Sequence, residues 1–214
     1  SHPTKLTIKL WMEIVKWGIN NKSHYKHIMS VALGVSREER DLIPDQLAEL
    51  GIGMLAFVLN PALKPYKKLV NNHSLDKFDE LKFGKFVDLE VYISDGINEN
   101  FDKIVSLLYD ATDVSDWDVA DVFGAVIAYN YYRLNLFRQY KNLFDTEGSS
   151  DDDEPQVRSI PRIWYDIIMV IADGQFLNID KVTDSPTIQC FNWLALKQMP
   201  IPVVNHQFQQ CHNI

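Results

Sequence analysis

The sequence contains little cysteine and no long apolar run, and each shortage excludes a class of protein. Cys190 and Cys211 are the only cysteines among 214 residues, too few for the disulfide framework of a small secreted domain. Free thiols in a reducing compartment are therefore expected. The chain also lacks a run of about eighteen apolar residues, so no helix is expected to cross a bilayer. Folding can bury roughly 70% of the surface of a chain of this length, so disulfides are not needed for stability.

Sequence motifs of common enzyme classes are also missing. Neither a GxGxxG loop nor a Walker phosphate loop occurs, and there is no glycine-flanked nucleophile elbow. Neighbouring carboxylates such as Asp116 and Asp118 are two residues apart, a spacing that directs the side chains to different sides of a helix. The sequence therefore predicts no catalytic residue and no cofactor.

The chain is acidic, with a formal net charge of -8. Such a protein repels the phosphate backbone over a Debye length of about 10 Å, which disfavours sequence-independent binding of nucleic acid. No motif points to a sequence-specific nucleic-acid partner either. The remaining class that fits the composition is a protein that binds other proteins.

A metal site in the C-terminal tail is the sharpest chemical alternative. His206, Cys211 and His212 are competent ligands within seven residues of one another. Their spacing matches no standard zinc pattern, a fourth ligand is missing, and adjacent side chains such as Cys211 and His212 rarely reach one ion together. A metal-dependent enzyme built on these residues is therefore the less favoured hypothesis, and no metal site is predicted.

Apolar periodicity and capping signals predict a mainly α fold, a compact multi-helix domain with one long central helix. Ser36 and Glu39 form the pattern of a capping box, and Ser159 with Pro161 and then Gly174 bracket another helix. The segment 61–81 reads as an irregular connector that could contain one or two short strands. Helices are expected near 6–17, 23–33, 47–58, 83–93, 98–109, 116–144, 163–172 and 186–199.

Composition also predicts how the chain is divided. Residues 145–156 carry six acidic side chains with glycine, serine and proline, so we expect a mobile acidic loop without the ligand pattern of an EF-hand. Residues 1–144 are expected to form the main helical domain, because the helices at 157–199 are too short to bury a core alone and should pack on it. Two prolines, Pro200 and Pro202, predict an extended tail over 200–214.

Aromatic residues crowd the second half of the expected long helix. Because they occupy several of its faces, not all of them are expected to enter one core. Tyrosine and similar residues are favoured at interfaces, where they bury a large area and keep one polar end wet. Two interpretations stay open: a helix buried on all sides, or a helix with partner-binding anchors at Tyr129, Tyr132, Phe137 and Tyr140.

Several short segments occur in an order that resembles small tailed-phage proteins described as tail-assembly or virion components, including those of crAss-like gut phages. The segment from Phe83 to Glu90 (FGKFVDLE) is similar to an "FGxaxDL(E/D)" motif, in which Gly84, Asp88 and Leu89 are matching positions. It is followed by LLY at 107–109 and by FGA at 123–125. Trp164 and Tyr165 then begin a "WYxxaxxaAxG" element that ends at Gly174, so that the resemblance covers residues 83–174. The family form has an arginine and a proline where this chain has Asp110 and Ala111.

The resemblance implies a virion structural or assembly protein whose motif residues have packing roles. Its expected partners are other phage structural proteins in an oligomeric ring or similar assembly, as a neck-ring, adaptor or packaged component. It implies assembly in the host cytoplasm and a final location in the virion, with no membrane partner. The alternative within the same family is a soluble tail-assembly chaperone that leaves before the particle is complete. In neither case does the resemblance imply a catalytic residue.

Overall fold

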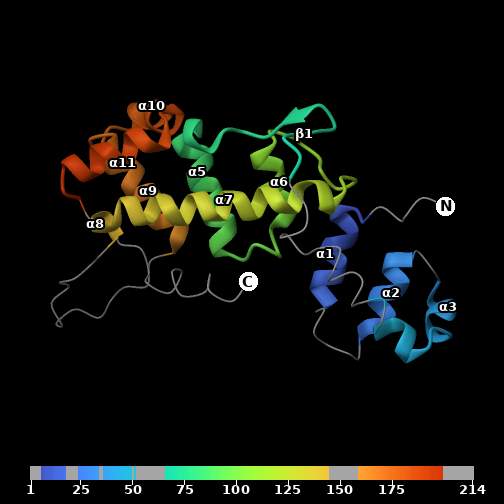
Figure 1. The fold of residues 1–214 in the computed structure, drawn as a ribbon. Coiled ribbons are helices and arrows are strands. Elements are labelled where there is room, and N and C mark those ends of the chain that lie inside the picture. The colour runs from blue at the N-terminus through green and yellow to red at the C-terminus, as the bar shows by residue number, and fades with distance from the viewer. Residues whose placement is uncertain are drawn as a thin grey trace, which may run out of the picture. The chain divides into compact units, whose positions relative to one another are not determined.

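The computed structural model describes residues 6–17, 24–33, 36–49, 51, 66–144 and 159–199. Over these residues the chain is mainly helical, which confirms the predicted fold class (Figure 1). The expected acidic loop at 145–156 and the expected tail at 200–214 lie outside the described residues.

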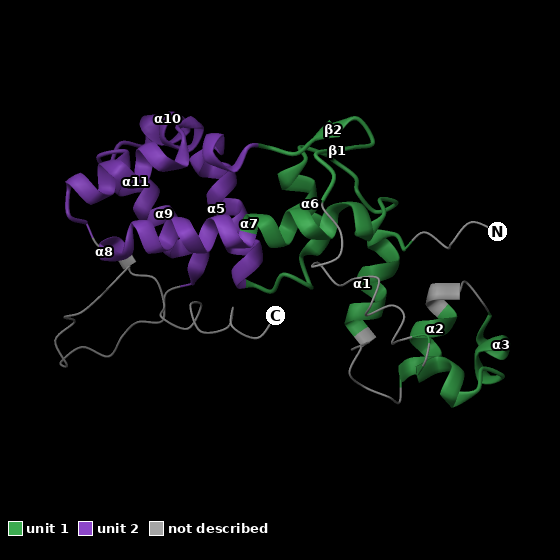
Figure 2. Ribbon diagram, viewed as in Figure 1, with its two compact units in different colours: residues 1–76, 95–129 green, residues 77–94, 130–214 purple. Residues whose placement is uncertain are grey.

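The chain divides into two compact units (Figure 2). Unit 1 comprises residues 1–76 and 95–129, and unit 2 comprises residues 77–94 and 130–214. The last passage from one unit to the other lies within the longest helix, α7 (Val119–Gln139). These boundaries differ from the expected division at residue 144, because 77–94 and the second half of α7 are grouped with the helices that follow residue 158.

Unit 1 holds its first helix by backbone hydrogen bonds to the segment that precedes α7. Ile8 N donates to Trp117 O at 2.9 Å, and Val119 N donates to Leu6 O at 2.9 Å. Ile14 is buried on the same helix. Helices of this unit include α1 (Ile8–Trp17), α2 (Tyr25–Leu33), α3 (Arg37–Asp41), α6 (Phe101–Leu108) and the first half of α7, and residues 45–49 are helical as well.

The predicted capping box at the start of α3 is confirmed. The Ser36 hydroxyl accepts a hydrogen bond from Glu39 N at 3.3 Å, while the Glu39 carboxylate accepts one from Ser36 N at 2.8 Å. These bonds to Ser36 stabilise the charged carboxylate and lower the pKa of Glu39. Two of the donors that a helix start leaves unpaired are thereby satisfied.

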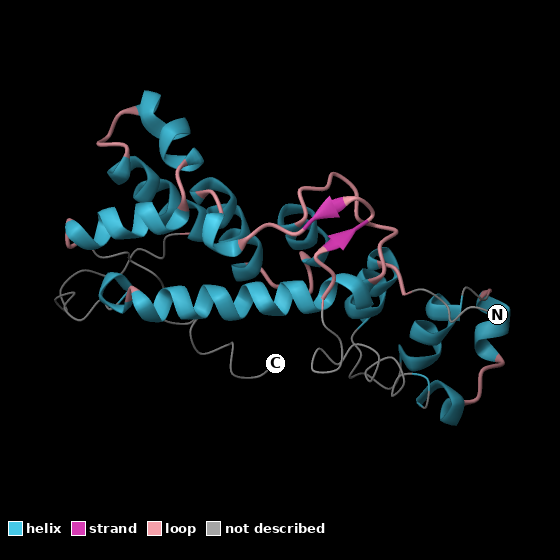
Figure 3. Cartoon of the chain, turned by 45° about the horizontal axis from the view of Figure 1, so that its top comes forward, coloured by secondary structure: helices cyan, strands magenta, loops and turns pink. Residues whose placement is uncertain are grey.

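Among the described residues, strands occur only in one antiparallel hairpin, β1 (Leu69–Val70) and β2 (His73–Ser74) (Figure 3). Its two-residue turn is formed by Asn71 and Asn72, whose φ angles of 47° and 70° are both positive. A tight hairpin turn of the type I′ class requires positive φ at both positions, and asparagine adopts it more readily than most residues. The short strands expected in the connector are therefore present.

Unit 2 is a cluster of short helices around α5 (Phe83–Ser94) and the second half of α7. The expected helix near 163–172 is present as α9, and Gly174 lies just beyond its end with a φ of 69°. The other helices of the unit are η3 (Phe78–Glu80), α8 (Lys141–Phe144), α9 (Ile160–Ile171), η4 (Phe176–Asn178), α10 (Ile179–Asp184) and α11 (Thr187–Leu196).

The long helix predicted over 116–144 is shorter than expected. It begins at Val119 and ends at Gln139, and the separate short helix α8 follows after Tyr140. At the break, Leu143 N donates to the carbonyl of Tyr140 at 2.8 Å, three residues back instead of four. This tighter turn redirects the chain and buries Leu143, whose exposed fraction is 3%.

Candidate interaction surface

The centre of unit 2 is an aromatic cluster that holds α5, α9 and α11 together. Phe86 of α5 meets Trp164 of α9 and Phe191 of α11 with ring centroids 5.6 and 5.5 Å apart, edge to face in both cases. Phe83 meets the same two rings at 6.2 Å each. Such edge-to-face pairs contribute about 0.5–1.5 kcal/mol each beyond the area that they bury. The cluster therefore fixes α9 and α11 relative to α5 within unit 2.

A second set of contacts fastens the start of α5 to the junction between α10 and α11. Phe83 N donates to Ser185 O at 2.8 Å, and Leu81 O accepts hydrogen bonds from the backbone N and hydroxyl of Thr187 at 2.9 and 2.8 Å. Lys82 forms an exposed ion pair with Asp184 at 2.8 Å, which raises the pKa of the lysine. A buried network of backbone bonds and an exposed pair therefore hold this joint.

Some residues of the phage-like motifs are buried in unit 2, and others are exposed on its surface. Phe83, Leu89, Glu90 and Trp164 are buried. Gly84 packs so close to α10 that a Cβ atom on it would lie 3.0 Å from the Cβ atom of Thr183. Asp88 lies on the exposed side of α5, where partial desolvation raises its pKa, and Tyr165 is 44% exposed beneath the guanidinium of Arg162.

Glu90 and Arg133 form an ion pair inside unit 2. Arg133 Nε donates to Glu90 Oε1 at 2.5 Å, and the two side chains are only 3% and 2% exposed. Burial raises the pKa of Glu90, while the positive charge of Arg133 opposes that rise. The guanidinium also lies 4.8 Å from the ring centre of Phe137. The pair joins α5 to α7, and no pattern in the sequence indicated that an arginine on the long helix would be buried.

The four proposed partner-binding aromatics do not form a common surface. Tyr129 and Phe137 are 0% and 3% exposed, so neither side chain can anchor a partner while the fold is intact. Tyr132 packs against Phe78 with ring centroids 5.6 Å apart. Tyr140 packs against Phe191, and its hydroxyl donates to Asn192 Oδ1 at 2.6 Å. The buried-helix interpretation holds for Tyr129 and Phe137.

Two apolar side chains that the sequence analysis did not single out are instead displayed between α9 and α10. Phe176 and Leu177 are 73% and 86% exposed, and we call them the apolar tip. The chain reaches the tip through a left-handed turn at Asp173 and Gly174, with φ angles of 55° and 69°. The only sequence signal for this turn was Gly174, read as the end of α9.

Hydrogen bonds close the turn that carries the apolar tip. Gly174 N donates to Met169 O at 2.9 Å, which closes the end of α9. The side-chain amide of Asn178 donates to Gln175 Oε1 at 3.2 Å and to Ala172 O at 3.5 Å, so it bridges the two ends of the turn. The two side chains of the tip are therefore exposed on a turn that hydrogen bonds close.

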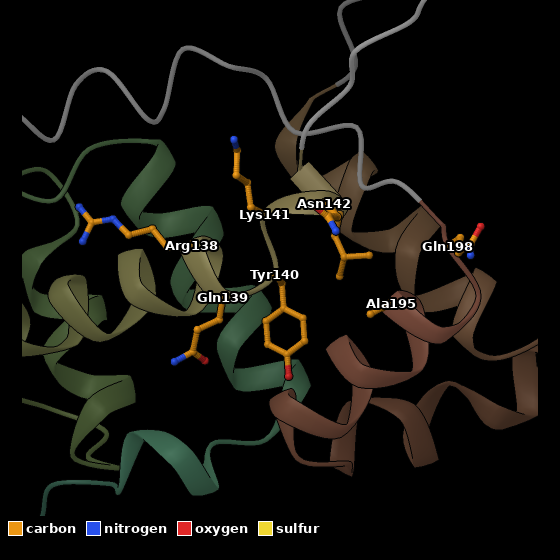
Figure 4. A pocket seen from close by; sticks show the side chains of 8 residues that line it. Arg138, Gln139, Tyr140, Lys141, Asn142, Ala195 and Gln198 are labelled. Atoms are coloured by element: carbon orange, nitrogen blue, oxygen red, sulfur yellow. The ribbon is translucent and has the colours of Figure 1, made fainter.

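A hollow of about 700 Å³ lies between α8 and the end of α11, and we call it the α8–α11 hollow. Figure 4 shows residues from the end of α7 and from α8 on one side, and Ala195 and Gln198 on the other. None of its described lining residues is acidic, whereas Arg138 and Lys141 are cationic. The full described lining is Arg138, Gln139, Tyr140, Lys141, Asn142, Leu143, Ala195 and Gln198.

The remaining points raised by the sequence concern metal ligands, cysteine thiols and membrane-spanning helices. His206, Cys211 and His212 lie outside them. Within the described ranges no group of three or more His, Cys, Asp or Glu side chains is placed to hold a metal ion. The thiol of Cys190 is buried, which raises its pKa to about 11. None of the described helices is long and apolar enough to cross a membrane.

Comparison with known proteins found no matching family model and no matching curated protein or solved structure.

Proposed function

We propose that this chain is a non-enzymatic structural or assembly protein of a tailed-phage particle, acting through protein–protein contacts. The observation that carries the assembly role is the apolar tip, because Phe176 and Leu177 are 73% and 86% exposed on a hydrogen-bonded turn. Complete burial of each side chain stabilises a contact by roughly 1.5–3 kcal/mol. A turn that is already closed by hydrogen bonds adds to the affinity, since a partner then has less conformational freedom to remove.

The use of ionisable groups in unit 2 supports a non-catalytic role. The buried pair of Glu90 and Arg133 is occupied in joining α5 to α7. Burial of Cys190 raises the pKa of its thiol to about 11, which keeps it in the unreactive protonated form at neutral pH. The described lining of the α8–α11 hollow offers cations and amides without a carboxylate to act as a general base.

The phage assignment rests on the ordered resemblance between residues 83 and 174. In this proposal the chain is a neck-ring, adaptor or packaged component that is assembled in the host cytoplasm and retained in the virion. Its partners are other phage structural proteins and further copies of itself. The motif residues then serve to build the aromatic cluster of unit 2, as Phe83 and Trp164 do here.

The test is a mass-spectrometric inventory of purified particles of the phage that encodes this chain. We expect peptides of this chain at a level that is stoichiometric with the other particle proteins. Its absence from mature particles, together with its presence on assembly intermediates, would favour the tail-assembly chaperone. Absence from both would contradict the proposed function.

The contribution of the apolar tip is tested in the same particles with a Phe176→Ser and Leu177→Ser double variant. We expect its incorporation to fall by about tenfold or more, as for loss of an interface anchor. The matched control is Leu42→Ser with Leu47→Ser, which removes two apolar side chains that are 80% and 56% exposed in unit 1. Equal loss in both double variants would indicate a general effect of surface polarity on expression or solubility.

A further inference from the structure

We infer that the apolar tip of one copy of this chain inserts into the α8–α11 hollow of a second copy, so that copies join head to tail. This inference rests on the proposed assembly role and names one partner, the chain itself. Both surfaces belong to unit 2, which is one compact unit.

The hollow suits a small apolar insert with polar surroundings. Its volume of about 700 Å³ lies within the range of roughly 300–1,000 Å³ that is typical of sites for small ligands. The Tyr140 ring and the methyl group of Ala195 give it apolar walls, and the buried Leu143 lies among its lining residues. A phenylalanine and a leucine side chain are groups of the size and chemistry that such a hollow accepts.

Charge at the two surfaces is complementary. The tip is flanked along the chain by Asp173 and Asp180, and Lys181 follows Asp180; all three are exposed, so this side carries a net negative charge. Arg138 and Lys141 in the lining of the hollow are exposed as well, and they are the charged members of its described lining. A tip inserted into the hollow brings a side with one net negative charge, from Asp173, Asp180 and Lys181, toward Arg138 and Lys141. Such an arrangement selects partner and orientation more than it adds affinity.

The two surfaces require different copies of the chain. Phe176 and Leu177 remain 73% and 86% exposed, and neither lines the hollow, so a copy does not fill its own hollow with its own tip. We infer a heterologous contact, in which one tip enters one hollow between two copies and the contact is not returned, so that a joined pair still offers one tip and one hollow. Heterologous contacts of this kind produce closed rings or open chains.

The test uses the full chain and two variants whose defects are complementary. The tip variant carries Phe176→Ser and Leu177→Ser. The hollow variant carries Ala195→Glu, which adds bulk and a negative charge at an exposed residue in the lining of the hollow. A contact made by one tip is small, so we expect weak association and would measure sedimentation over about 1–500 µM. Circular dichroism and thermal unfolding establish that both variants are folded.

We expect the unaltered chain to form species larger than a dimer as its concentration rises. Each variant alone should be monomeric, with association weakened by about tenfold or more. A mixture of the two variants should form a 1:1 heterodimer and nothing larger, because only the tip of the hollow variant and the hollow of the tip variant are intact. A tip-to-tip contact would not show this complementation, and a reciprocal two-fold dimer would leave the unaltered chain no larger than a dimer.

Three results would overturn the inference: a monomeric unaltered chain over the whole concentration range, self-association of the hollow variant alone, or no heterodimer in the mixture. None of these results touches the particle inventory, which decides the proposed function separately. If the tip variant is lost from particles although the purified chain stays monomeric, the tip binds a different virion protein and the self-contact is wrong.

Discussion

At the scale of single residues, the buried pair of Glu90 and Arg133 decides how unit 2 responds to substitution. Both side chains are at most 3% exposed, so removing one leaves the other charge without its partner in a place that water does not reach. Losing one member of a buried pair typically costs about 3–5 kcal/mol, whereas replacing both members by apolar residues is often neutral or stabilising. Removal of one member of the pair is therefore expected to destabilise unit 2 far more than replacement of both members by apolar residues.

Arg133→Ala is accordingly expected to lower the free energy of unfolding by about 3–5 kcal/mol at pH 7 in urea titrations. The double variant Glu90→Leu with Arg133→Met should recover most of that loss. Glu80→Gln, which breaks an exposed pair with Lys77, serves as the control and should change little. Equal losses from Arg133→Ala and from the double variant would mean that packing, and not the stranded charge, causes the destabilisation.

The pH dependence of Arg133→Ala follows from the same pair. Burial already raises the pKa of Glu90, and loss of the arginine removes the charge that opposes this rise. The folded variant then binds a proton more tightly than its unfolded chain, so its stability falls as pH rises through the folded pKa. We expect the deficit relative to the unaltered chain to be smaller at pH 5 than at pH 8, and a pH-independent deficit would contradict this account.

Residue burial on α7 shows what the sequence could not decide. Composition placed aromatic residues on several faces of one helix, which is compatible with a buried helix and with an exposed binding helix. Which face is covered depends on α5 and the other helices that meet α7 in space, and the pattern along α7 does not contain that information. Tyr129 and Phe137 are therefore core, while the tip residues Phe176 and Leu177 lay in a segment without periodicity.

At the scale of elements, Gly84 allows α5 to pack closely against α10. A Cβ atom on Gly84 would lie 3.0 Å from the Cβ atom and 3.3 Å from the carbonyl oxygen of Thr183 in α10. Alanine gains up to about 1 kcal/mol over glycine in a helix interior and less at Gly84, the second residue of α5, whereas crowding of this kind costs about 1–3 kcal/mol. The two effects nearly cancel for alanine, and crowding dominates for a larger side chain.

Gly84→Ala should therefore change the free energy of unfolding by no more than about 1 kcal/mol, and Gly84→Leu should lower it by about 2 kcal/mol or more. Gly174 is the matched control, because no atom lies within 4 Å of a Cβ there and only its φ of 69° is unusual. Asparagine adopts that conformation readily, so Gly174→Asn should be tolerated while Gly84→Asn is not. Thermal unfolding of the four variants tests this, and an equally stable Gly84→Leu would refute the packing role.

The elements that the sequence predicted well are those with both a periodic apolar face and a local end signal. α5 and α9 agree with expectation, because Asp95 and Gly96 end the first and Ser159 and Gly174 bracket the second. α10 was missed, since its six residues include only one buried apolar side chain, Val182. The end of α7 was placed too late because the break at Tyr140 involves neither proline nor glycine.

At the scale of the whole molecule, the division into units could not be read from composition. The acidic segment at 145–156 suggested a boundary in sequence, yet the described contacts group 77–94 and 130–144 with the later helices. Aromatic contacts over long sequence separations, such as Phe86 with Phe191, create that grouping. Composition along the sequence shows local changes, but it does not show which residues far apart in the sequence are in contact.

The net charge of the whole chain sets the salt dependence of the proposed head-to-tail contact. Each copy carries a formal charge of -8, so copies repel one another over a Debye length of about 30 Å in 0.01 M salt, whereas the contact itself joins opposite charges. Near 0.15 M salt the Debye length falls to about 8 Å, which screens the distant repulsion before the close attraction. At 1 M salt the attraction is screened too.

Association measured by sedimentation should therefore be strongest near physiological salt and several-fold weaker at about 0.01 M and 1 M. The charge-neutralising variant Lys141→Gln is expected to weaken association near 0.15 M and to flatten the decline toward 1 M, since it removes part of the attraction that salt screens. A steady increase in association with salt, unchanged by Lys141→Gln, would mean that apolar burial of Phe176 and Leu177 acts alone and that the charges beside the tip and the hollow have no role in joining copies.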